Sequence, residues 1–212
     1  MEYTAVIFDL DGVICRTDRY HYQAWKALAD SLHIPFDEQV NNRLRGISRM
    51  DSLRIILRHG NVTCPPQEME RLAERKNRLY RELLQGMTPA DLSGEVSDTL
   101  HYLRGRGIRL AIGSSSKNTA LILRRIGLSG FFDAVADGTQ ITHAKPDPEV
   151  FTLAARLLGV SPPQALVVED AEAGIEAAHR GGFSAAGLGE AARTADYPLG
   201  SFSDLKRLFA AQ

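Results

Sequence analysis

The sequence has little of several features that would narrow its function at once. Only two of the 212 residues are cysteines, Cys15 and Cys64, which excludes a disulfide framework and a cysteine-based metal cluster. The formal net charge is −1, so there is no broad electrostatic attraction to nucleic acid or to an anionic membrane. No apolar run approaches the length that spans a bilayer, and no N-terminal secretion signal is visible. We expect a cytoplasmic monomer whose partner is a small molecule.

What the chain does contain is an ordinary globular composition, 44% hydrophobic, which can build a real core. The apolar run at 4–8 predicts a strand buried on both faces. Residues 19–86 have mostly helical patterns, several of them ending in glycine. From about residue 88 onwards, predicted helices alternate with predicted strands at 108–113, 131–137, 165–170 and 184–188.

Such alternation predicts an α/β fold, a Rossmann-like parallel sheet with helices on both faces. The predicted catalytic core comprises residues 1–15 and 88–212. Residues 16–87 are predicted to be a small helical-bundle cap domain, inserted after the first strand. The tail is predicted to end in a short helix.

Polar side chains cluster where the predicted strands end. In a parallel open sheet, ligands bind at the edge formed by the carboxyl ends of the strands. Acidic, hydroxyl and amine side chains follow these ends in four short motifs: FDLDG with Asp9 and Asp11, GSSSKN with Ser114 to Asn118, AKPDP with Lys145, and VVEDAEAG with Glu169 and Asp170. If the strands share one sheet, these motifs meet at one edge.

Each motif alone also has a plain structural interpretation. An Asp-x-Asp is commonly a turn or a cap, a single lysine is commonly solvated, and serine runs or acidic pairs commonly start helices. Together they favour a site, because converging carboxylates repel one another and need a cation to hold them. Oxygen ligands without histidine or cysteine suit Mg²⁺. A carboxylate nucleophile, a hydroxyl cradle and a lysine are typical of phosphoryl transfer.

The four motifs, in this order, resemble those of the haloacid dehalogenase superfamily, and the helical insert resembles that superfamily's small cap. More narrowly, HYQAWKAL, RGISRMDSL, ERKN, GSSSKN and AKPDPE are similar to the superfamily's sugar-phosphate mutases, from residue 1 to about 190. One departure lies in the hinge, where relatives often have Thr-Asp-Thr and this chain has Cys15-Arg16-Thr17.

The resemblance implies a role for each motif. Asp9 is the implied nucleophile, Asp11 the general acid and base, and His21 part of a hinge network that positions Asp11. Mg²⁺ is implied to bind Asp9, the carbonyl of Asp11, Glu169 and Asp170. The transferring phosphoryl group is implied to bind Ser114, the amide of Ser115, and Lys145.

The stretch RGISRMDS, residues 45–52, raises a separate question. Ser48 and Asp51 predict a helix start, since Ser48 can cap the free amides and Asp51 suits the positive end of the helix dipole. Arg49 does not suit that end, and its planar fork is fit for phosphate. The resemblance assigns the distal phosphate and the sugar to Gly46, Ile47, Ser48, Arg49, Lys76, Ser116, Lys117 and Asn118, and the hinge to Thr17.

Other residues of the insert have ordinary interpretations. Without the resemblance, His21 is a packed or surface histidine, and Trp25 is a core residue. Lys76 and Asn77 can reach the sugar hydroxyls, but a solvated helix face fits them equally well. Cys15 fits a small buried apolar role better than that of a reactive thiol.

Three functions are compatible with the predicted fold and the four motifs. The resemblance implies a mutase that interconverts β-glucose 1-phosphate and glucose 6-phosphate through β-glucose 1,6-bisphosphate. The alternative is a sugar-phosphate phosphatase of the same superfamily, in which water attacks the aspartyl phosphate. A regulatory phosphoacceptor domain also combines a parallel sheet, clustered acids and a lysine. The long helical insert and the SSSKN loop argue against that function.

Overall fold

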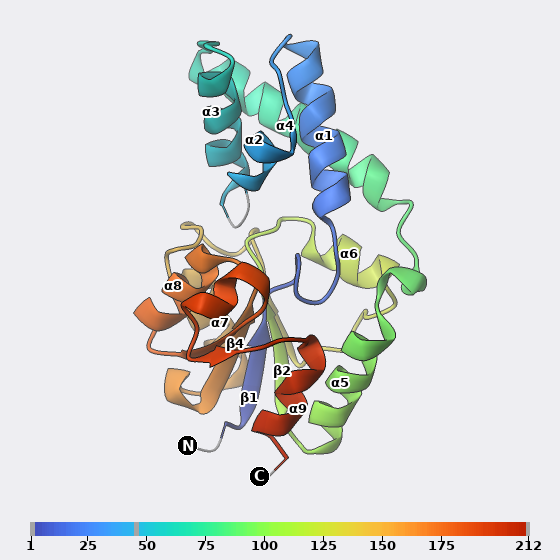
Figure 1. Ribbon diagram of the computed structural model, residues 1–212, viewed down its shortest axis with the longest axis vertical. Helices are drawn as coiled ribbons and strands as arrows, with labels where there is room; N and C mark the ends of the chain where they lie inside the picture. The colour runs from blue at the N-terminus through green and yellow to red at the C-terminus, as the bar shows by residue number, and fades with distance from the viewer. Residues whose placement is uncertain (1–2, 45–46, 211–212) are drawn as a thin grey trace. The chain divides into compact units, whose positions relative to one another are not determined.

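The computed structural model describes residues 3–44 and 47–210, and the chain in it forms two compact units (Figure 1). The first unit comprises Met1–Arg16 and Thr88–Gln212, and the second comprises Thr17–Met87. The chain therefore passes from one unit to the other between Arg16 and Thr17, and returns between Met87 and Thr88.

The first unit is built on a six-stranded sheet in which every neighbouring pair of strands is parallel. The strand order is β3-β2-β1-β4-β5-β6. The strands are β1 Ala5–Phe8, β2 Arg109–Gly113, β3 Ala134–Ala136, β4 Ala165–Glu169, β5 Ser184–Gly187 and β6 Tyr197–Pro198. This order is that of the doubly wound nucleotide-binding folds, so the predicted Rossmann-like class is confirmed. The two-residue strand β6 was not predicted.

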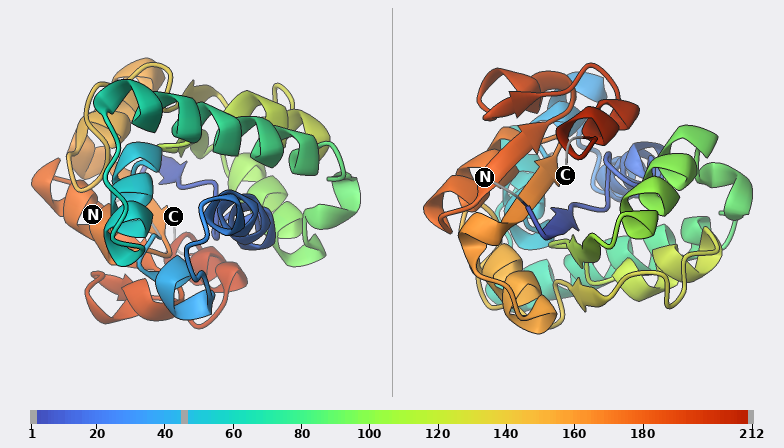
Figure 2. Two further views of the ribbon diagram at one scale, coloured as in Figure 1. Left: turned by 90° about the horizontal axis from the view of Figure 1, so that it is seen from above. Right: turned by 90° about the horizontal axis from the view of Figure 1, so that it is seen from below.

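Helices cover both faces of this sheet, as the views in Figures 1 and 2 show. Ala5 and Ile7 belong to the apolar cluster of one face, which is covered by α7 (Glu149–Leu158) and α8 (Glu172–Arg180). Phe8 packs on Phe132 and Phe202 at the other face. The other α-helices described in the unit are α5 Gly94–Gly105, α6 Thr119–Arg125 and α9 Leu205–Leu208. Short 3-10 helices lie at Pro89–Asp91, Pro162–Gln164, Gly189–Arg193 and Phe202–Asp204.

The register of the sheet places the strand ends level with one another. Phe8 is paired with Ile112 of β2 on one side and with Val168 of β4 on the other. The next residues along the three strands, Asp9, Gly113 and Glu169, therefore reach the carboxyl edge together. The strand order reverses at β1, which is where open α/β sheets bind their ligands.

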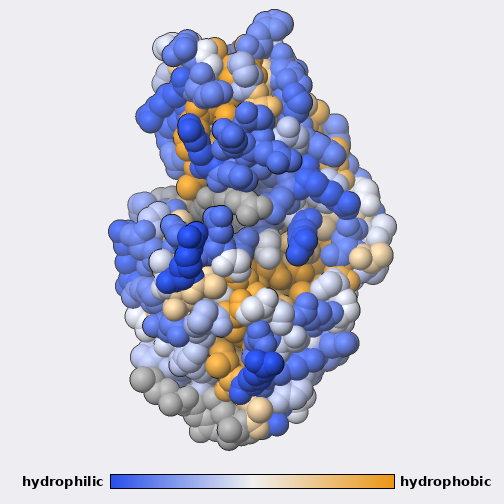
Figure 3. Space-filling model, viewed as in Figure 1, coloured by the Kyte–Doolittle hydropathy of each residue, from blue (hydrophilic) through white to orange (hydrophobic). Residues whose placement is uncertain are grey.

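The described residues of the second unit form four helices: α1 Asp18–Ser31, α2 Glu38–Asn42, α3 Arg49–His59 and α4 Pro66–Leu84. Trp25, Leu28, Leu53, Ile56 and Leu72 are among the buried residues of its own apolar core. Hydrophilic residues cover most of its visible surface in Figure 3. Among the described residues, no helix is both long and apolar enough to cross a membrane.

The predicted start of α3 is confirmed. Ser48 has an extended backbone, and its Oγ accepts a hydrogen bond of 3.1 Å from the amide of Asp51. The same hydroxyl donates to the Asp51 carboxylate at 2.6 Å. Arg49 is the first residue of the helix, and Gly60 ends it.

Candidate active site

A buried lysine holds two of the strand-end carboxylates together. Lys145 Nζ donates to Asp9 Oδ1 and to Glu169 Oε1, at 2.5 Å in each case. All three side chains are at least nine-tenths buried, with exposed fractions of 3%, 10% and 2%. The sequence places these residues in three separate motifs, and the sheet brings them into one ion-pair network.

The electrostatics of this network are dominated by burial. Burial raises the pKa of Asp9 well above its ordinary value; Lys145 lowers it, and Glu169, Asp11 and Asp170 raise it further. For Lys145, burial lowers the pKa, but Asp9 and Glu169 outweigh burial and leave it above its ordinary value. The lysine stays charged, and one ammonium does not balance the acidic groups around Asp9.

The carboxylates fit a hard divalent cation. One oxygen each of Asp9, Glu169 and Asp170 lies within 4.8 Å of the others. Such an all-oxygen donor set with a local excess of negative charge suits Mg²⁺. We therefore treat these three side chains as a candidate cation site.

Replacing Lys145 by methionine tests this charge balance. The change removes the ammonium and leaves Asp9 and Glu169 buried without it, so we expect the free energy of unfolding to fall by about 3–5 kcal/mol in metal-free buffer. Urea unfolding, with and without Mg²⁺, measures the effect. Mg²⁺ should restore part of the loss, because it supplies positive charge to the same carboxylates.

Lys26→Met is the control for that experiment. Lys26 is paired with Asp30 on the surface of α1, at 2.9 Å, and the loss of this exposed pair should leave the free energy of unfolding almost unchanged. Equal losses in the two variants would show that the buried network has no special role in stability.

Two glycines make room for the acidic groups of the fourth motif. A Cβ at Gly174, in α8, would lie 2.0 Å from Cδ of Glu169. A Cβ at Gly12 would lie 2.1 Å from Oδ2 of Asp170, and the φ of Gly12, 91°, is also one that favours glycine. The amides of Asp170 and Ala171 donate to Glu169 Oε2 at 2.9 and 3.0 Å and fix that carboxylate from the other side.

Gly174→Ala should therefore displace Glu169 from its place beside Lys145. We expect the free energy of unfolding to fall by about 1–3 kcal/mol, because the methyl group overpacks a buried site. Gly105→Ala in α5 is the matched control, since a Cβ there meets nothing within 4 Å and alanine favours a helix over glycine. Thermal or urea unfolding of both variants checks the prediction, and a Gly174→Ala protein as stable as wild type would contradict it.

Ser114 to Asn118 form a tight loop at the end of β2. Ser114 is 1% exposed, and its Oγ accepts a hydrogen bond from the amide of Ser116 at 3.1 Å. Ser116 Oγ in turn accepts from the amide of Asn118 at 3.2 Å. Ser115 Oγ is buried and has no hydrogen-bond partner within the described parts of the chain. Lys117 is exposed, and α6 begins directly after Asn118.

The segment after β1 turns back on itself. The amide of Gly12 donates to the carbonyl of Cys15 at 2.8 Å, and Asp11 forms an isolated bridge with Cys15. Cys15 is buried, and burial, followed by Asp11 and Asp9, raises the pKa of its thiol. The thiol therefore stays protonated at neutral pH, in agreement with the predicted buried role.

In the second unit, Arg49 is half-buried at the start of α3. Burial lowers the pKa of its guanidinium, while Tyr80 and Glu74 of α4 raise it, and an arginine remains charged under either influence. Ile47 and Ser48 directly precede it and are also half-buried. Gly46, which the resemblance assigns to the same group, lies outside the described residues.

His21 and Lys76 meet inside the second unit. Lys76 Nζ lies 2.9 Å from His21 Nδ1, and Lys76 is 2% exposed. A solvated helix face, one of the two interpretations given to Lys76, is therefore wrong. Thr17 is 1% exposed, and its carbonyl accepts the amide of His21 at 3.1 Å. Asn77 is half-buried.

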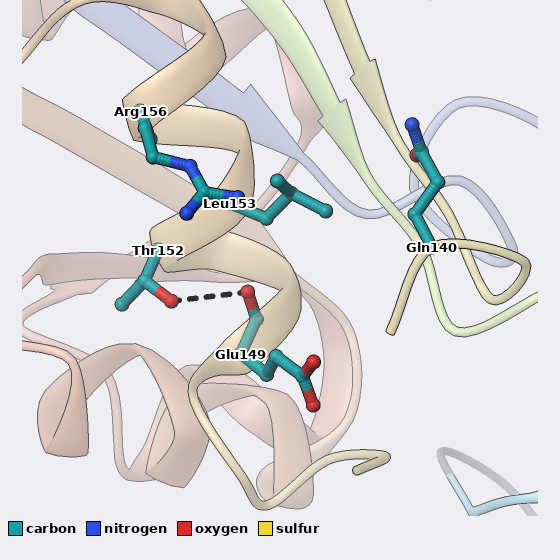
Figure 4. A pocket seen from close by; sticks show the side chains of 5 residues that line it. All are labelled: Gln140, Glu149, Thr152, Leu153 and Arg156. Atoms are coloured by element: carbon teal, nitrogen blue, oxygen red, sulfur yellow. Dashed lines mark hydrogen bonds between the residues drawn. The ribbon is translucent and has the colours of Figure 1, made fainter. Parts of the chain in front are cut away.

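A pocket of about 270 Å³ lies elsewhere on the first unit, and Figure 4 shows the residues that line it. It is lined by Gln140, Glu149, Thr152, Leu153 and Arg156, four of which belong to α7. None of the strand-end residues Asp9, Lys145, Glu169 and Asp170 lines it.

The sequence interpretation missed two contributions to these sites. Gly174 was not singled out, although a glycine inside a predicted helix is itself a signal of close packing. Tyr80 was also missed, and it lies one helical turn after Lys76, where the two side chains share a face.

Residues 3–182 match the family described as haloacid dehalogenase-like hydrolase. The chain is 44% identical to a β-phosphoglucomutase of Bacillus subtilis, over 88% of this chain and 83% of that protein. It is 31% identical to a fructose-1-phosphate phosphatase of Escherichia coli, over 86% and 95% of the two chains. Among solved structures, a β-phosphoglucomutase from Clostridium difficile is similar over 99% of this chain and 96% of that one, with a TM-score of 0.92 and 37% identity.

Proposed function

The chain belongs to the haloacid dehalogenase-like hydrolase family, and from this premise we propose that it is a mutase that moves a phosphoryl group between carbons 1 and 6 of glucose. The observation that carries the proposal is the similarity to the Clostridium difficile β-phosphoglucomutase structure over 99% of the chain. That similarity includes the inserted unit, Thr17–Met87.

The proposed reaction begins with an aspartyl phosphate on Asp9. The 6-hydroxyl of β-glucose 1-phosphate attacks its phosphorus, Asp11 accepts the hydroxyl proton, and the P–O bond to Asp9 breaks, which yields β-glucose 1,6-bisphosphate. The bisphosphate then turns around, and Asp9 attacks the phosphorus at carbon 1. Asp11 returns its proton to the departing O1, so that glucose 6-phosphate leaves and the aspartyl phosphate is restored.

The groups around Asp9 suit this chemistry. Ser114, the amide of Ser115 and Lys145 are proposed to bind the transferring phosphoryl group, where charge spreads in the transition state. Asp9, the carbonyl of Asp11, Glu169 and Asp170 are proposed to hold Mg²⁺. When bound, Mg²⁺ neutralises the negative charge of the carboxylates and the phosphoryl oxygens.

A mutase also needs a site for the phosphate that is not being transferred. We assign this distal phosphate to Arg49 with Ser116, Lys117 and Asn118, and the neighbouring sugar contacts to Ile47, Ser48 and Lys76. Gly46 belongs to the same proposed set. A charged, half-buried guanidinium at a helix N-terminus, where a cation is otherwise disfavoured, supports this role for Arg49.

A phosphatase activity is the second candidate, because similar proteins include phosphatases of phosphorylated carbohydrates and of fructose 1-phosphate. The two functions differ in whether water or a sugar receives the phosphoryl group from Asp9. A thousandfold preference for the sugar needs roughly 4 kcal/mol of difference between the two barriers.

A product assay separates the two functions. The purified protein is given β-glucose 1-phosphate, Mg²⁺ and a trace of β-glucose 1,6-bisphosphate, and both glucose 6-phosphate and inorganic phosphate are followed. A mutase yields glucose 6-phosphate with little inorganic phosphate. Rapid release of inorganic phosphate without glucose 6-phosphate would establish the phosphatase instead.

A further inference from the structure

Three groups of the second unit lie close to the ammonium of Lys76. Its Nζ lies 4.6 Å from the ring centroid of Trp25 and 4.5 Å from that of Tyr80. The third group is His21 Nδ1, at 2.9 Å. Trp25 and His21 come from α1, while Lys76 and Tyr80 come from α4. The arrangement therefore belongs to one helix pair, α1 and α4.

The same rings also constrain His21. The imidazole lies against the ring of Tyr80, with centroids 4.1 Å apart and planes tilted by 31°. Tyr80 thus contacts both members of the His21–Lys76 pair. Trp25 and Tyr80 are 2% and 1% exposed, so the rings are themselves held by the core of the unit.

The hydrogen bond between His21 and Lys76 can form in two ways. Either a charged lysine donates to a bare Nδ1, or Nδ1–H donates to a neutral amine. The two ring faces favour the first arrangement, because an aromatic face attracts a cation and gains little from a neutral amine. Desolvation, then Lys76, then Arg49 lower the pKa of His21 well below its ordinary value, in agreement with a neutral imidazole beside an ammonium.

We propose that Trp25 and Tyr80 form an aromatic cage that keeps buried Lys76 charged beside His21 and thereby sets the tautomer of His21, with its proton on Nε2. Trp25 and Tyr80 are positioning residues in this account, since they act through Lys76 and His21. The significance for turnover rests on the proposed function: the resemblance implies that His21 belongs to a hinge network that positions Asp11, and the tautomer decides which ring nitrogen can donate a hydrogen bond.

Nitrogen NMR of ¹⁵N-histidine-labelled protein with Mg²⁺ tests the cage directly, because the two neutral tautomers give distinct signals. The His21 signals are identified by their loss in His21→Asn. Wild type should show a neutral imidazole protonated on Nε2. Tyr80→Phe keeps the ring face and should retain this pattern. Tyr80→Leu and Lys76→Met should shift it toward the Nδ1–H tautomer.

Tyr22→Leu is the matched control for Tyr80→Leu. Tyr22 is also an aromatic residue of the second unit, but its ring packs on Phe36 at 5.7 Å. The Tyr22→Leu substitution should therefore leave the tautomer of His21 unchanged. Any of three results would overturn the proposal. These are a wild-type His21 protonated on Nδ1, an unchanged tautomer in Tyr80→Leu, and a shift to the Nδ1–H tautomer in Tyr22→Leu.

Kinetics separate this proposal from the proposed function. Tyr80→Leu should lower kcat for glucose 6-phosphate formation about tenfold and leave the hydrolysis of acetyl phosphate unaffected. Tyr80→Phe should keep the wild-type kcat, because phenylalanine retains the aromatic face. If wild type formed no glucose 6-phosphate, the mutase proposal would fail, but the NMR experiment would still decide whether the cage sets the tautomer.

Discussion

Replacing Asp9 by asparagine is expected to reduce all phosphoryl transfer by about 10⁴-fold or more, because the amide cannot form the covalent phosphate. The position of Asp9 makes it the best candidate nucleophile. It directly follows the central strand β1, lies level with the end of β4, and pairs with Lys145 at 2.5 Å. Asparagine has nearly the same shape, so the loss should come from chemistry and not from misfolding.

Two assays measure the consequence. Formation of glucose 6-phosphate and hydrolysis of acetyl phosphate should both disappear in Asp9→Asn, since both pass through the aspartyl phosphate. Circular dichroism should show the wild-type fold. Asp98→Asn, at an exposed position of α5, is the control and should keep full activity. Turnover by Asp9→Asn within tenfold of wild type would show that another residue is the nucleophile.

Replacing Arg49 by alanine is expected to separate the two activities. The proposed distal site holds a phosphate that only the sugar substrates carry, so glucose 6-phosphate formation should fall by about 10–10²-fold, the cost of a charged hydrogen-bonded contact. Hydrolysis of acetyl phosphate should stay within about threefold of wild type, because that substrate has no second phosphate. Arg49→Lys should be intermediate, since lysine keeps the charge but loses the bidentate geometry.

Arg54→Ala is the control for this experiment. Arg54 belongs to the same helix and is paired with Asp51 on the surface, at 2.6 Å. Its replacement tests whether any loss of an arginine from α3 lowers turnover. Parallel losses of both activities in Arg49→Ala, or the same defect in Arg54→Ala, would contradict the distal-phosphate role.

Much of this site could be predicted from the sequence because short apolar runs end in polar motifs. The run AVIF ends at FDLDG and the run ALVVE ends at the acidic pair, and in a parallel sheet such ends share an edge. Asp9, Glu169 and Asp170 could therefore be placed together from the strand ends alone. The two hydrogen bonds of Lys145 could not be predicted, because they depend on how the loop after β3 returns to the sheet.

The interior of α4 shows where the sequence argument fails. Most of its charged residues are exposed, so a lysine within the run ERKNR has the appearance of one more solvated side chain. Lys76 is buried instead, because Trp25 and Tyr80 supply aromatic faces that compensate the ammonium. The Trp25 contact joins two helices that are far apart in sequence, so no single-helix pattern contains it, whereas the Tyr80 contact lies within α4 at a spacing of four residues. Gly46, in contrast, lies outside the described residues, so its proposed role stays a prediction.

The fate of the phosphoryl group on Asp9 tests the central claim most directly. Enzyme carrying a ³²P-labelled aspartyl phosphate is mixed with excess β-glucose 1-phosphate and Mg²⁺, and the labelled products of a single turnover are separated. The mutase account predicts that the label enters glucose bisphosphate and glucose 6-phosphate in preference to inorganic phosphate by about a thousandfold, the ratio that corresponds to roughly 4 kcal/mol. Label released mainly as inorganic phosphate, at a rate that β-glucose 1-phosphate does not change, would contradict it.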